Sequence, residues 1–134
     1  MQQYDLHLKL TTMKTTSRLF LPALFFVLCI SCNLTVDEKL VIGDWKGVEW
    51  LVTGQDSDYD ASTTFFSFLE DGKYTYQYGD MGEEGEYYVV NNELFTTPNG
   101  GMKMMVRIKT LTQDTMVLNM NRGGTSESLT LARR

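Results

Sequence analysis

The chain has 134 residues, with 17 acidic and 12 basic side chains, one histidine and two cysteines, and its formal net charge is −5. An acidic surface repels phosphate backbones, so this charge argues against nucleic acid as a partner. The single histidine, His7, lies far upstream, so residues 32–134 lack the imidazole of Ser–His and Cys–His pairs and of histidine zinc sites. Carboxylate pairs are left as acid–base candidates, but none stands in an apolar setting. We expect a protein that is not an enzyme and that holds no metal or cofactor.

Residues 19–30 form an apolar run that ends next to the two cysteines. A helix of this length spans about 18 Å, which is less than the roughly 30 Å of a bilayer core. The length is typical of the apolar centre of a signal peptide, and two basic residues directly precede the run when the sequence is read from Met13. We therefore predict that residues 1–31 are a signal peptide and that translation starts at Met13.

The end of the apolar run resembles the lipobox of bacterial lipoproteins, in which a small residue precedes a cysteine that receives a diacylglycerol. Ser31 precedes Cys32, whereas the bulky Leu28 precedes Cys29, so Cys32 is the better candidate for lipidation. The alternative is an ordinary secretion signal with a chance cysteine. Several acyl chains anchor a protein stably, so we expect a membrane as partner. Residues 33–36 lack the acidic side chains associated with surface display, which favours the cell envelope at the outer membrane, facing the periplasm.

The segment that follows, residues 32–43, mixes polar and apolar side chains. We predict that it tethers the lipid anchor to a folded domain, residues 44–134. Within the tether, Asp37 and Glu38 suit the positive N-terminus of one helical turn over "DEKLVI". We expect this turn to close the base of the domain.

One acidic stretch invites a metal interpretation. The sequence "DSDYD", residues 56–60, alternates acids as a calcium-binding EF-hand loop does at its start. Such a loop requires glycine at its sixth position and glutamate at its twelfth, where this chain has Ala61 and Ser67. We therefore expect a solvated loop here and no metal site.

Residues 44–134 alternate between apolar and polar side chains, and turn residues recur about every eleven residues. This pattern is typical of antiparallel sheet with one buried face, and closing such a sheet removes both edge strands. The sequence therefore predicts an all-β fold, an eight-stranded antiparallel up-and-down (meander) barrel. The predicted strands are 45–53, 62–69, 73–78, 86–90, 93–97, 102–110, 115–121 and 126–133.

The first predicted strand breaks the alternation. Trp45 has one parity, whereas Val48, Trp50 and Val52 have the other. An extra residue at Gly47 would restore the phase, because a β-bulge inserts one residue without a cross-strand partner. We predict a bulge at Gly47 that places all four apolar side chains on one face.

The residues next to Trp45 resemble a known family. "IGDWKG" matches the Gly-x-Trp motif of lipocalins and related calycin barrels, and "FSFLEDGKYTY", "GEYYVVNNEL" and "LTQDTMVLNM" are similar to small lipocalin-like lipoproteins of Bacteroidetes. The resemblance covers residues 40–134 and implies structural roles for Gly43 and Trp45. It also implies that Arg133, on the last strand, packs over the Trp45 ring, a cation–π contact worth about 0.5–2 kcal/mol. The strands are shorter than in larger lipocalins, which argues for a shallow barrel.

Two functional hypotheses follow. In the first, the barrel interior binds a small apolar or amphipathic ligand between aromatic and methionine side chains, which are adaptable in shape; the alternative is that the same side chains fill a dry core. In the second, an envelope interaction or inhibitor module binds a protein partner through outward-facing Tyr74, Tyr78 and Tyr88 beside an acidic loop, residues 79–86. The predicted interior ligand-binding residues are Phe66, Phe68, Tyr76, Tyr87, Met104, Val106, Met116 and Leu118.

Overall fold

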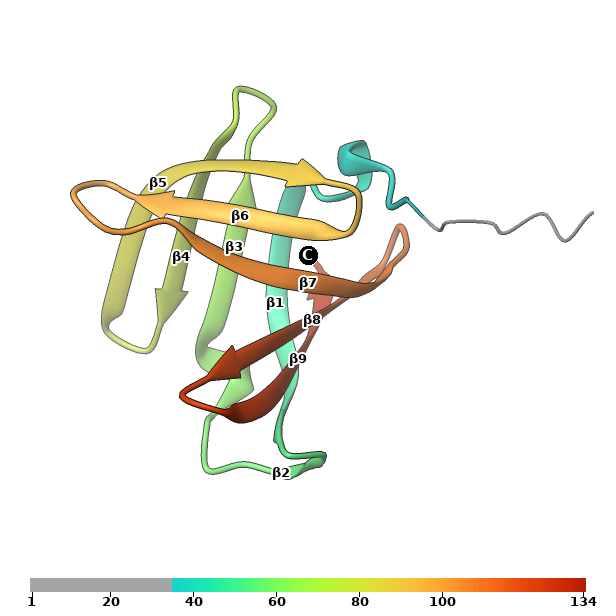
Figure 1. Ribbon diagram of the computed structural model, residues 1–134, viewed down its shortest axis with the longest axis vertical. Helices are drawn as coiled ribbons and strands as arrows, with labels where there is room; N and C mark the ends of the chain where they lie inside the picture. The colour runs from blue at the N-terminus through green and yellow to red at the C-terminus, as the bar shows by residue number, and fades with distance from the viewer. Residues whose placement is uncertain (1–34) are drawn as a thin grey trace, which may run out of the picture. The chain divides into compact units, whose positions relative to one another are not determined.

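The computed structural model describes residues 35–134 (Figure 1). The predicted signal peptide, the start at Met13 and the lipidation candidate Cys32 therefore lie outside the described residues. No helix within residues 35–134 is long and apolar enough to cross a membrane. The elements are η1 (Glu38–Leu40), β1 (Gly43–Val52), β2 (Gln55–Asp56), η2 (Ala61–Thr63), β3 (Thr64–Phe68), β4 (Lys73–Tyr78), β5 (Met81–Val90), β6 (Glu93–Pro98), β7 (Met104–Leu111), β8 (Thr115–Arg122) and β9 (Thr125–Arg133).

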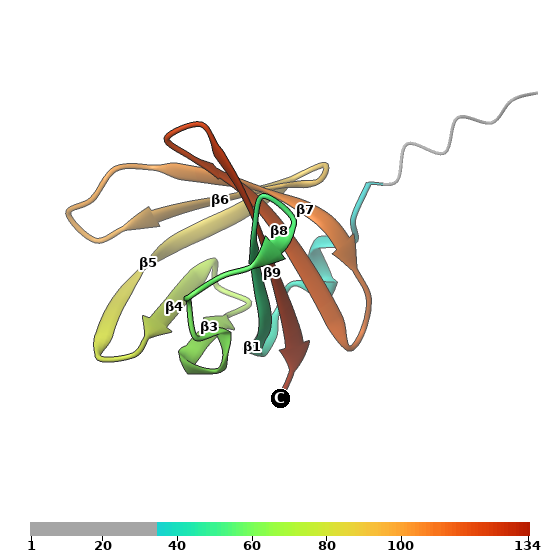
Figure 2. The same ribbon diagram turned by 90° about the horizontal axis from the view of Figure 1, so that it is seen from below.

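The strands form one closed antiparallel sheet. Strand β1 pairs with β3, each strand from β3 to β8 pairs with the next in the chain, and β9 returns to pair with β1 (Figures 1 and 2). The two-residue β2 adds only a short hairpin to the end of β1. Eight strands thus close a meander barrel, which confirms the predicted fold class. The sequence did not predict β2, whose two exposed residues are too short a run for alternation to register.

Strand β5 is longer than predicted. It begins at Met81, and its first half pairs with β4 from Tyr78↔Met81 to Lys73↔Glu86. The acidic loop predicted over residues 79–86 is therefore wrong, since most of it is strand. Its glycines signalled a turn, but Gly85 is a strand residue that brings two backbones together: a Cβ there would overlap the backbone of Thr97.

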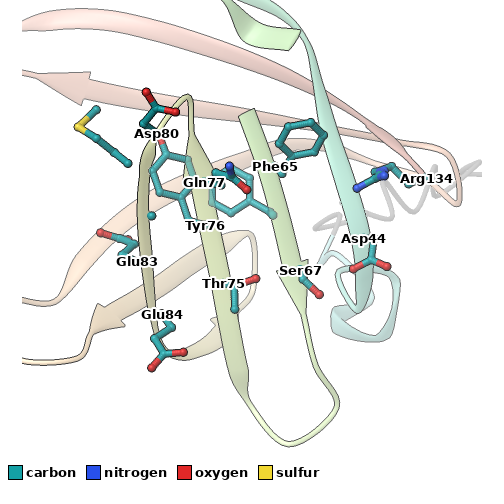
Figure 3. A pocket seen from close by; sticks show the side chains of 13 residues that line it. Asp44, Phe65, Ser67, Thr75, Tyr76, Gln77, Asp80, Glu83, Glu84 and Arg134 are labelled. Carbon is teal, nitrogen blue, oxygen red and sulfur yellow. The ribbon is translucent and has the colours of Figure 1, made fainter. Parts of the chain in front are cut away.

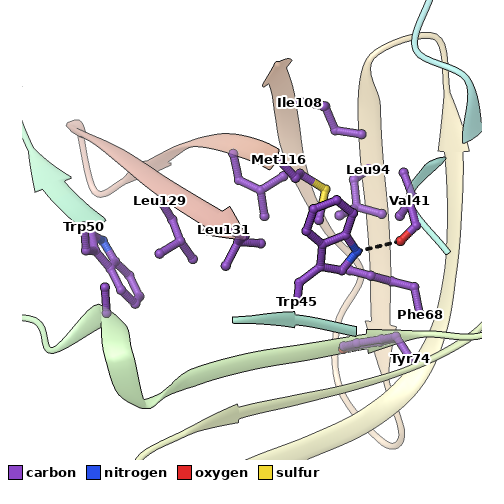
Figure 4. Close-up of a cluster of buried hydrophobic side chains, with 12 residues drawn as sticks. Val41, Trp45, Trp50, Phe68, Tyr74, Leu94, Ile108, Met116, Leu129 and Leu131 are labelled. Atoms are coloured by element: carbon purple, nitrogen blue, oxygen red, sulfur yellow. Dashed lines mark hydrogen bonds between the residues drawn. The ribbon is translucent and has the colours of Figure 1, made fainter. Parts of the chain in front are cut away.

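The core lies inside the barrel and comes from alternate residues of the strands (Figure 4). Strand β4 corrects one prediction, because Tyr74 is fully buried and Tyr78 packs against the core, so both face inward with Tyr76. Residues two apart on a strand share a face, and that rule already excluded an outward Tyr74 beside an inward Tyr76. Tyr88 faces outward as predicted. The buried hydrophobic residues are Val41, Trp45, Trp50, Ala61, Phe68, Tyr74, Leu94, Ile108, Met116, Leu118, Leu129 and Leu131.

The predicted bulge is present in β1. Opposite β9, the register passes from Gly47↔Leu131 to Glu49↔Thr130, so Val48 has no cross-strand partner. The extra residue restores the phase of the strand, and both Trp45 and Trp50 are buried. Val48 itself points outward and is 61% exposed, so its predicted place on the inner face is wrong. The extra residue of a bulge has no partner in the ladder and does not follow the alternation of the strand.

A single turn of 3₁₀ helix, η1, closes one end of the barrel. The Asp37 side chain caps it by accepting a hydrogen bond from the Lys39 backbone N–H at 3.1 Å. Val41 follows and is fully buried, although it belongs to the range predicted as a tether. The Trp45 indole Nε1 donates to the Val41 carbonyl at 2.8 Å (Figure 4), which attaches this turn to β1.

Arg133 fastens the same end from the last strand. Its guanidinium carbon lies 4.2 Å from the centroid of the Trp45 ring, which is the cation–π contact that the family resemblance implies. Nη1 donates to the Ile42 carbonyl and Nη2 to the Leu40 carbonyl, each at 2.7 Å. Nε donates to the Gln113 carbonyl. One side chain therefore joins β9, β1, η1 and the β7–β8 turn.

Gly43 leaves room for that guanidinium. Its φ is +128°, which L side chains rarely adopt, and a Cβ at this position would overlap Arg133 Nη1. The glycine and the arginine thus form one structural unit with Trp45. Gly43 has this role because of the space it leaves as well as its backbone angle.

We predict that Arg133→Ala lowers the free energy of unfolding by about 2–4 kcal/mol, because it removes the cation–π contact and leaves three carbonyls without their donor. Arg134→Ala is the matched control: its guanidinium lies 5.2 Å from the Phe65 ring, and the residue is exposed. We expect this control to change stability by less than about 0.5 kcal/mol. Urea unfolding followed by far-UV circular dichroism measures both, and equal losses would contradict the role assigned to Arg133.

Candidate functional site

The barrel interior is packed near η1 and hollow at its other end. Near η1, Trp45 and Phe68 fill the interior with Val41, Met116 and Leu131 (Figure 4). At the other end lies a cavity of about 260 Å³, which we call the inner cavity. Its lining residues are Trp50, Phe66, Tyr74, Tyr76, Glu83, Leu94, Thr96, Met104, Val106, Leu118, Met120, Arg122 and Leu129.

The side chains of the inner cavity reach it by alternation. Trp50 pairs with Leu129 across β1 and β9, and Leu118 pairs with Leu129 from the other side, so these three share the inner face. Phe66 and Tyr76 form a cross-strand pair with ring centroids 4.7 Å apart. Most of the wall is therefore aromatic or aliphatic, which suits an apolar occupant.

One carboxylate faces the inner cavity from β5. Glu83 lies opposite Tyr76 in the sheet register, and its Oε1 accepts a hydrogen bond of 2.7 Å from the Tyr74 hydroxyl. Burial raises the pKa of the Tyr74 phenol well above its ordinary value, and the hydrogen bond to Glu83 raises it further. Burial also raises the pKa of Tyr76. Both phenols therefore stay protonated at neutral pH and can act as hydrogen-bond donors.

A second polar group lies at the end of the β8–β9 hairpin. Glu127 is only 4% exposed, and its Oε2 accepts a hydrogen bond of 2.9 Å from Trp50 Nε1. Its Oε1 lies 3.6 Å from Nε of Arg122. The Arg122 guanidinium also lies 6.0 Å from the centroid of the Trp50 ring. Glu127 is thus satisfied by two partners, which is the condition for keeping a buried carboxylate charged.

The comparisons with known proteins agree with this geometry. A model of the lipocalin-like domain family matches residues 41–118. The chain belongs to this family. The match begins at the buried Val41 and ends in β8, so it contains most of the walls of the inner cavity. The comparison with curated proteins finds no match.

Two solved structures are similar to this lipocalin-like domain. One is an uncharacterized protein from Bacteroides eggerthii, with a TM-score of 0.53 and 14% identity over 69% of this chain and 98% of that one. The other is a lipocalin-like protein from Bacteroides uniformis, with a TM-score of 0.53 and 14% identity over 67% of this chain and 96% of that one. At this identity the likeness concerns the fold alone.

Five of the eight interior residues predicted for ligand binding line the inner cavity of the lipocalin-like domain, and three do not. Phe68 and Met116 are fully buried in the packed end, where no space is left for a ligand. Tyr87 lies near η1, with its hydroxyl donating to the Leu69 carbonyl at 2.8 Å. Met102, the first residue of the predicted strand 102–110, instead precedes β7 and is 87% exposed. The five that line the cavity are Phe66, Tyr76, Met104, Val106 and Leu118.

Sequence reasoning missed the polar residues in the cavity and the buried Glu127 beside it. Tyr74 lies two residues from Tyr76, and Glu127 lies two residues from Leu129. Strand alternation alone therefore indicated that Tyr74 and Glu127 face inward. Arg122 has the parity of Met116 and Leu118, but it follows the end of the predicted strand, and its side chain is 59% exposed although it reaches the cavity. Glu83 gave no such signal, because it lies in a stretch predicted as a loop, and its place on the strand follows from a pairing register that a single sequence does not reveal.

A broader groove lies over β1, β3, β4 and β5, and Phe66, Tyr76 and Glu83 of the inner cavity also contribute to its lining (Figure 3). Its volume is about 670 Å³, and Phe65 lies in it between Arg134 and Lys46, whose charged groups are 5.2 and 5.8 Å from the ring centroid. Figure 3 shows its side chains spread over an open sheet face, with Asp44, Asp80 and Glu84 among them. Small-molecule sites enclose most of their ligand, so the inner cavity, which is less open to solvent than the groove, is the better candidate.

The acidic stretch over residues 56–60 has a structural use. Asp60 caps η2, because its Oδ1 accepts hydrogen bonds from the backbone N–H and the hydroxyl of Ser62, at 3.0 and 2.6 Å. Within residues 35–134, no group of three or more acidic, histidine or cysteine side chains is arranged to hold a metal ion.

We predict a steep loss of stability at alkaline pH that depends on Tyr74. The folded pKa of this phenol lies above its unfolded value of about 10, so its contribution is fully present below pH 10 and is lost progressively as pH rises from there toward the folded pKa. Urea unfolding at intervals between about pH 9 and pH 11.5 measures the slope. We expect Tyr74→Phe to reduce it, because phenylalanine does not ionise in the unfolded chain; an unchanged slope would contradict the assignment.

Proposed function

We propose that this lipocalin-like domain binds a small, largely apolar molecule in the inner cavity. The observation that carries the proposal is the hollow of about 260 Å³ inside a barrel whose other end is filled by buried side chains. Pockets for drug-sized ligands usually have about 300–1,000 Å³, so the occupant is smaller than those. The role is binding without catalysis.

The walls of the inner cavity support an apolar occupant. Methionines 104 and 120 supply flexible, polarizable side chains that adapt to the shape of a ligand. Phe66 and Tyr76 supply flat surfaces, and the polar groups Thr96, Glu83 and Arg122 are few enough to orient a ligand without excluding it. Met104 is 47% exposed, so it lies at the rim, where a ligand would enter.

We also propose that the domain is anchored in the cell envelope through a lipid on Cys32, at the outer membrane facing the periplasm. The support is the lipobox-like sequence "CISC" after an apolar run too short to span a bilayer. The folded domain begins with the η1 cap at Asp37, so only a few residues separate the anchor from the barrel. A ligand captured there would be held close to the membrane.

Binding of an envelope protein through the outer face is the second candidate function. It is supported by an aromatic pair, the exposed Tyr88 and the half-buried Phe95, whose rings stack with centroids 4.8 Å apart. The Lys103 ammonium lies 5.9 Å from the Tyr88 ring centroid and 5.8 Å from that of Phe95. Aromatic residues of this kind are enriched in interfaces. The patch is small, so the inner cavity remains the favoured site.

A bulky residue at the rim tests the cavity. Met104 and Met105 are neighbours on β7 with similar exposure, 47% and 50%, and they point to opposite faces of the sheet. We predict that Met104→Trp lowers the affinity for a small apolar probe, 1-hexanol, at least about tenfold, because the indole occupies the cavity. Met105→Trp should change it by less than about twofold. Isothermal titration calorimetry measures both.

The two native indoles report where the probe binds. Trp50 lines the inner cavity, whereas Trp45 lies in the packed end. In a ¹⁵N–¹H spectrum, 1-hexanol should move the Trp50 indole signal and leave the Trp45 signal in place. Equal effects of the two methionine variants, or a shift confined to Trp45, would contradict binding in the inner cavity.

The lipid anchor is tested by the two cysteines themselves. We predict that the full chain, expressed in a bacterium with lipoprotein-processing enzymes, incorporates labelled palmitate and partitions into detergent. Cys32→Ser should abolish both, whereas Cys29→Ser should retain both, because Cys29 lies within the predicted signal peptide. Labelling that survives Cys32→Ser would show that the lipid is attached elsewhere, and no labelling of the unchanged chain would show that it has no lipid anchor.

A further inference from the structure

The inner cavity contains a carboxylate without a cationic partner. Glu83 receives one hydrogen bond, from the Tyr74 hydroxyl at 2.7 Å. Among residues 35–134 the structure gives its side chain no other hydrogen bond and no ion pair. Its second oxygen, Oε2, is therefore free to accept from a ligand. Figure 3 shows Glu83 close to Tyr76, which is its cross-strand partner.

The other charges near the cavity cancel each other. Arg122 lines the inner cavity, but its guanidinium lies 3.6 Å from Glu127 and is paired with it. Glu127 itself is buried and also holds Trp50 Nε1. The uncompensated charge facing the cavity is therefore the negative charge of Glu83.

The walls around this charge include several aromatic rings. Trp50, Phe66, Tyr74 and Tyr76 all line the inner cavity together with Glu83. An aromatic ring carries negative charge on its face and attracts a cation that lies within about 6 Å of its centroid. Four rings and one carboxylate in a small cavity form a setting that favours positive charge.

We propose that the ligand of the inner cavity is a small apolar molecule with a cationic amine, and that Glu83 binds the amine. This inference rests on the proposed function and names the chemical class of the occupant. The ammonium donates a charge-assisted hydrogen bond to Glu83, and its apolar part contacts Leu94, Val106 and Leu118.

The opposite polarity, an anionic ligand bound by Arg122, is disfavoured by Glu127. To turn fully toward an anion, Arg122 must leave a carboxylate that is only 4% exposed. Glu127 would then keep a single donor, Trp50 Nε1, and a buried charge that loses its counterion is strongly destabilised. An amine requires no such rearrangement, because Glu83 has an oxygen to spare.

The charge of the whole domain favours the same class of ligand. Residues 32–134 have a formal charge of about −7, and Asp80 and Glu84 lie on the strand and turn next to Glu83. A field of this sign raises the local concentration of cations and the rate at which they associate. The domain therefore attracts amines before they reach the cavity.

The test uses three probes with the same six-carbon skeleton: hexylamine, 1-hexanol and hexanoate. By isothermal titration calorimetry at neutral pH, we expect hexylamine to bind about tenfold more tightly than 1-hexanol, and hexanoate to bind most weakly. Glu83→Gln keeps an acceptor for the Tyr74 hydroxyl and removes the charge. It should lower the affinity for hexylamine about tenfold and that for 1-hexanol by less than about twofold.

Glu84→Gln is the matched control, since it removes the same charge from the outer face of the same strand. It should leave all three affinities within about twofold of the original. Hexylamine binding no more tightly than 1-hexanol, or Glu83→Gln weakening both equally, would overturn the amine assignment alone. If hexanoate binds most tightly, the amine assignment is also overturned, and Arg122 becomes the residue that binds the polar end of the ligand. If none of the probes moves the Trp50 indole signal, the proposed function fails as well.

Discussion

The contact between Arg133 and Trp45 is the interaction on which the rest of the structure depends. An up-and-down barrel is stable only if its last strand returns to its first, and β9 and β1 meet with these two side chains facing each other. The guanidinium also holds two carbonyls of the η1 segment. The Arg133 guanidinium thus stabilises both the closure of the sheet and the position of η1 at the end of the barrel. Gly43 leaves the space that the guanidinium occupies.

Because side chains fill the end of the barrel near η1, only the other end has room for a ligand. Trp45 and its neighbours fill the barrel near η1. The side chains in the rest of the interior leave a cavity between them. Trp50 stands at that hollow end, where Glu127 holds its indole N–H and so fixes the ring as a wall. The two tryptophans of β1 therefore differ in role: Trp45 fills the interior of the barrel, whereas Trp50 lines the inner cavity.

The sequence was sufficient for the fold because alternation and turn residues are local signals, and eight strands of this spacing leave few arrangements other than a meander barrel. The sequence was insufficient where the direction of a single side chain depends on the pairing register of its strand. Val48 points outward because the bulge itself leaves it unpaired, and Tyr74 was misplaced although its parity with Tyr76 was visible. The inward position of Glu83 was not predictable, since a glycine-rich acidic stretch reads as a turn until its pairing with β4 is known.

The central claim is that the hollow end of the barrel holds a small apolar amine. The most direct measurement is native mass spectrometry of the protein purified gently from its own organism. We predict a reproducible extra mass that organic solvent releases, and a released compound that carries a basic nitrogen on an apolar skeleton. A bare protein mass would contradict the claim and would direct attention to the outer face around Tyr88 and Phe95.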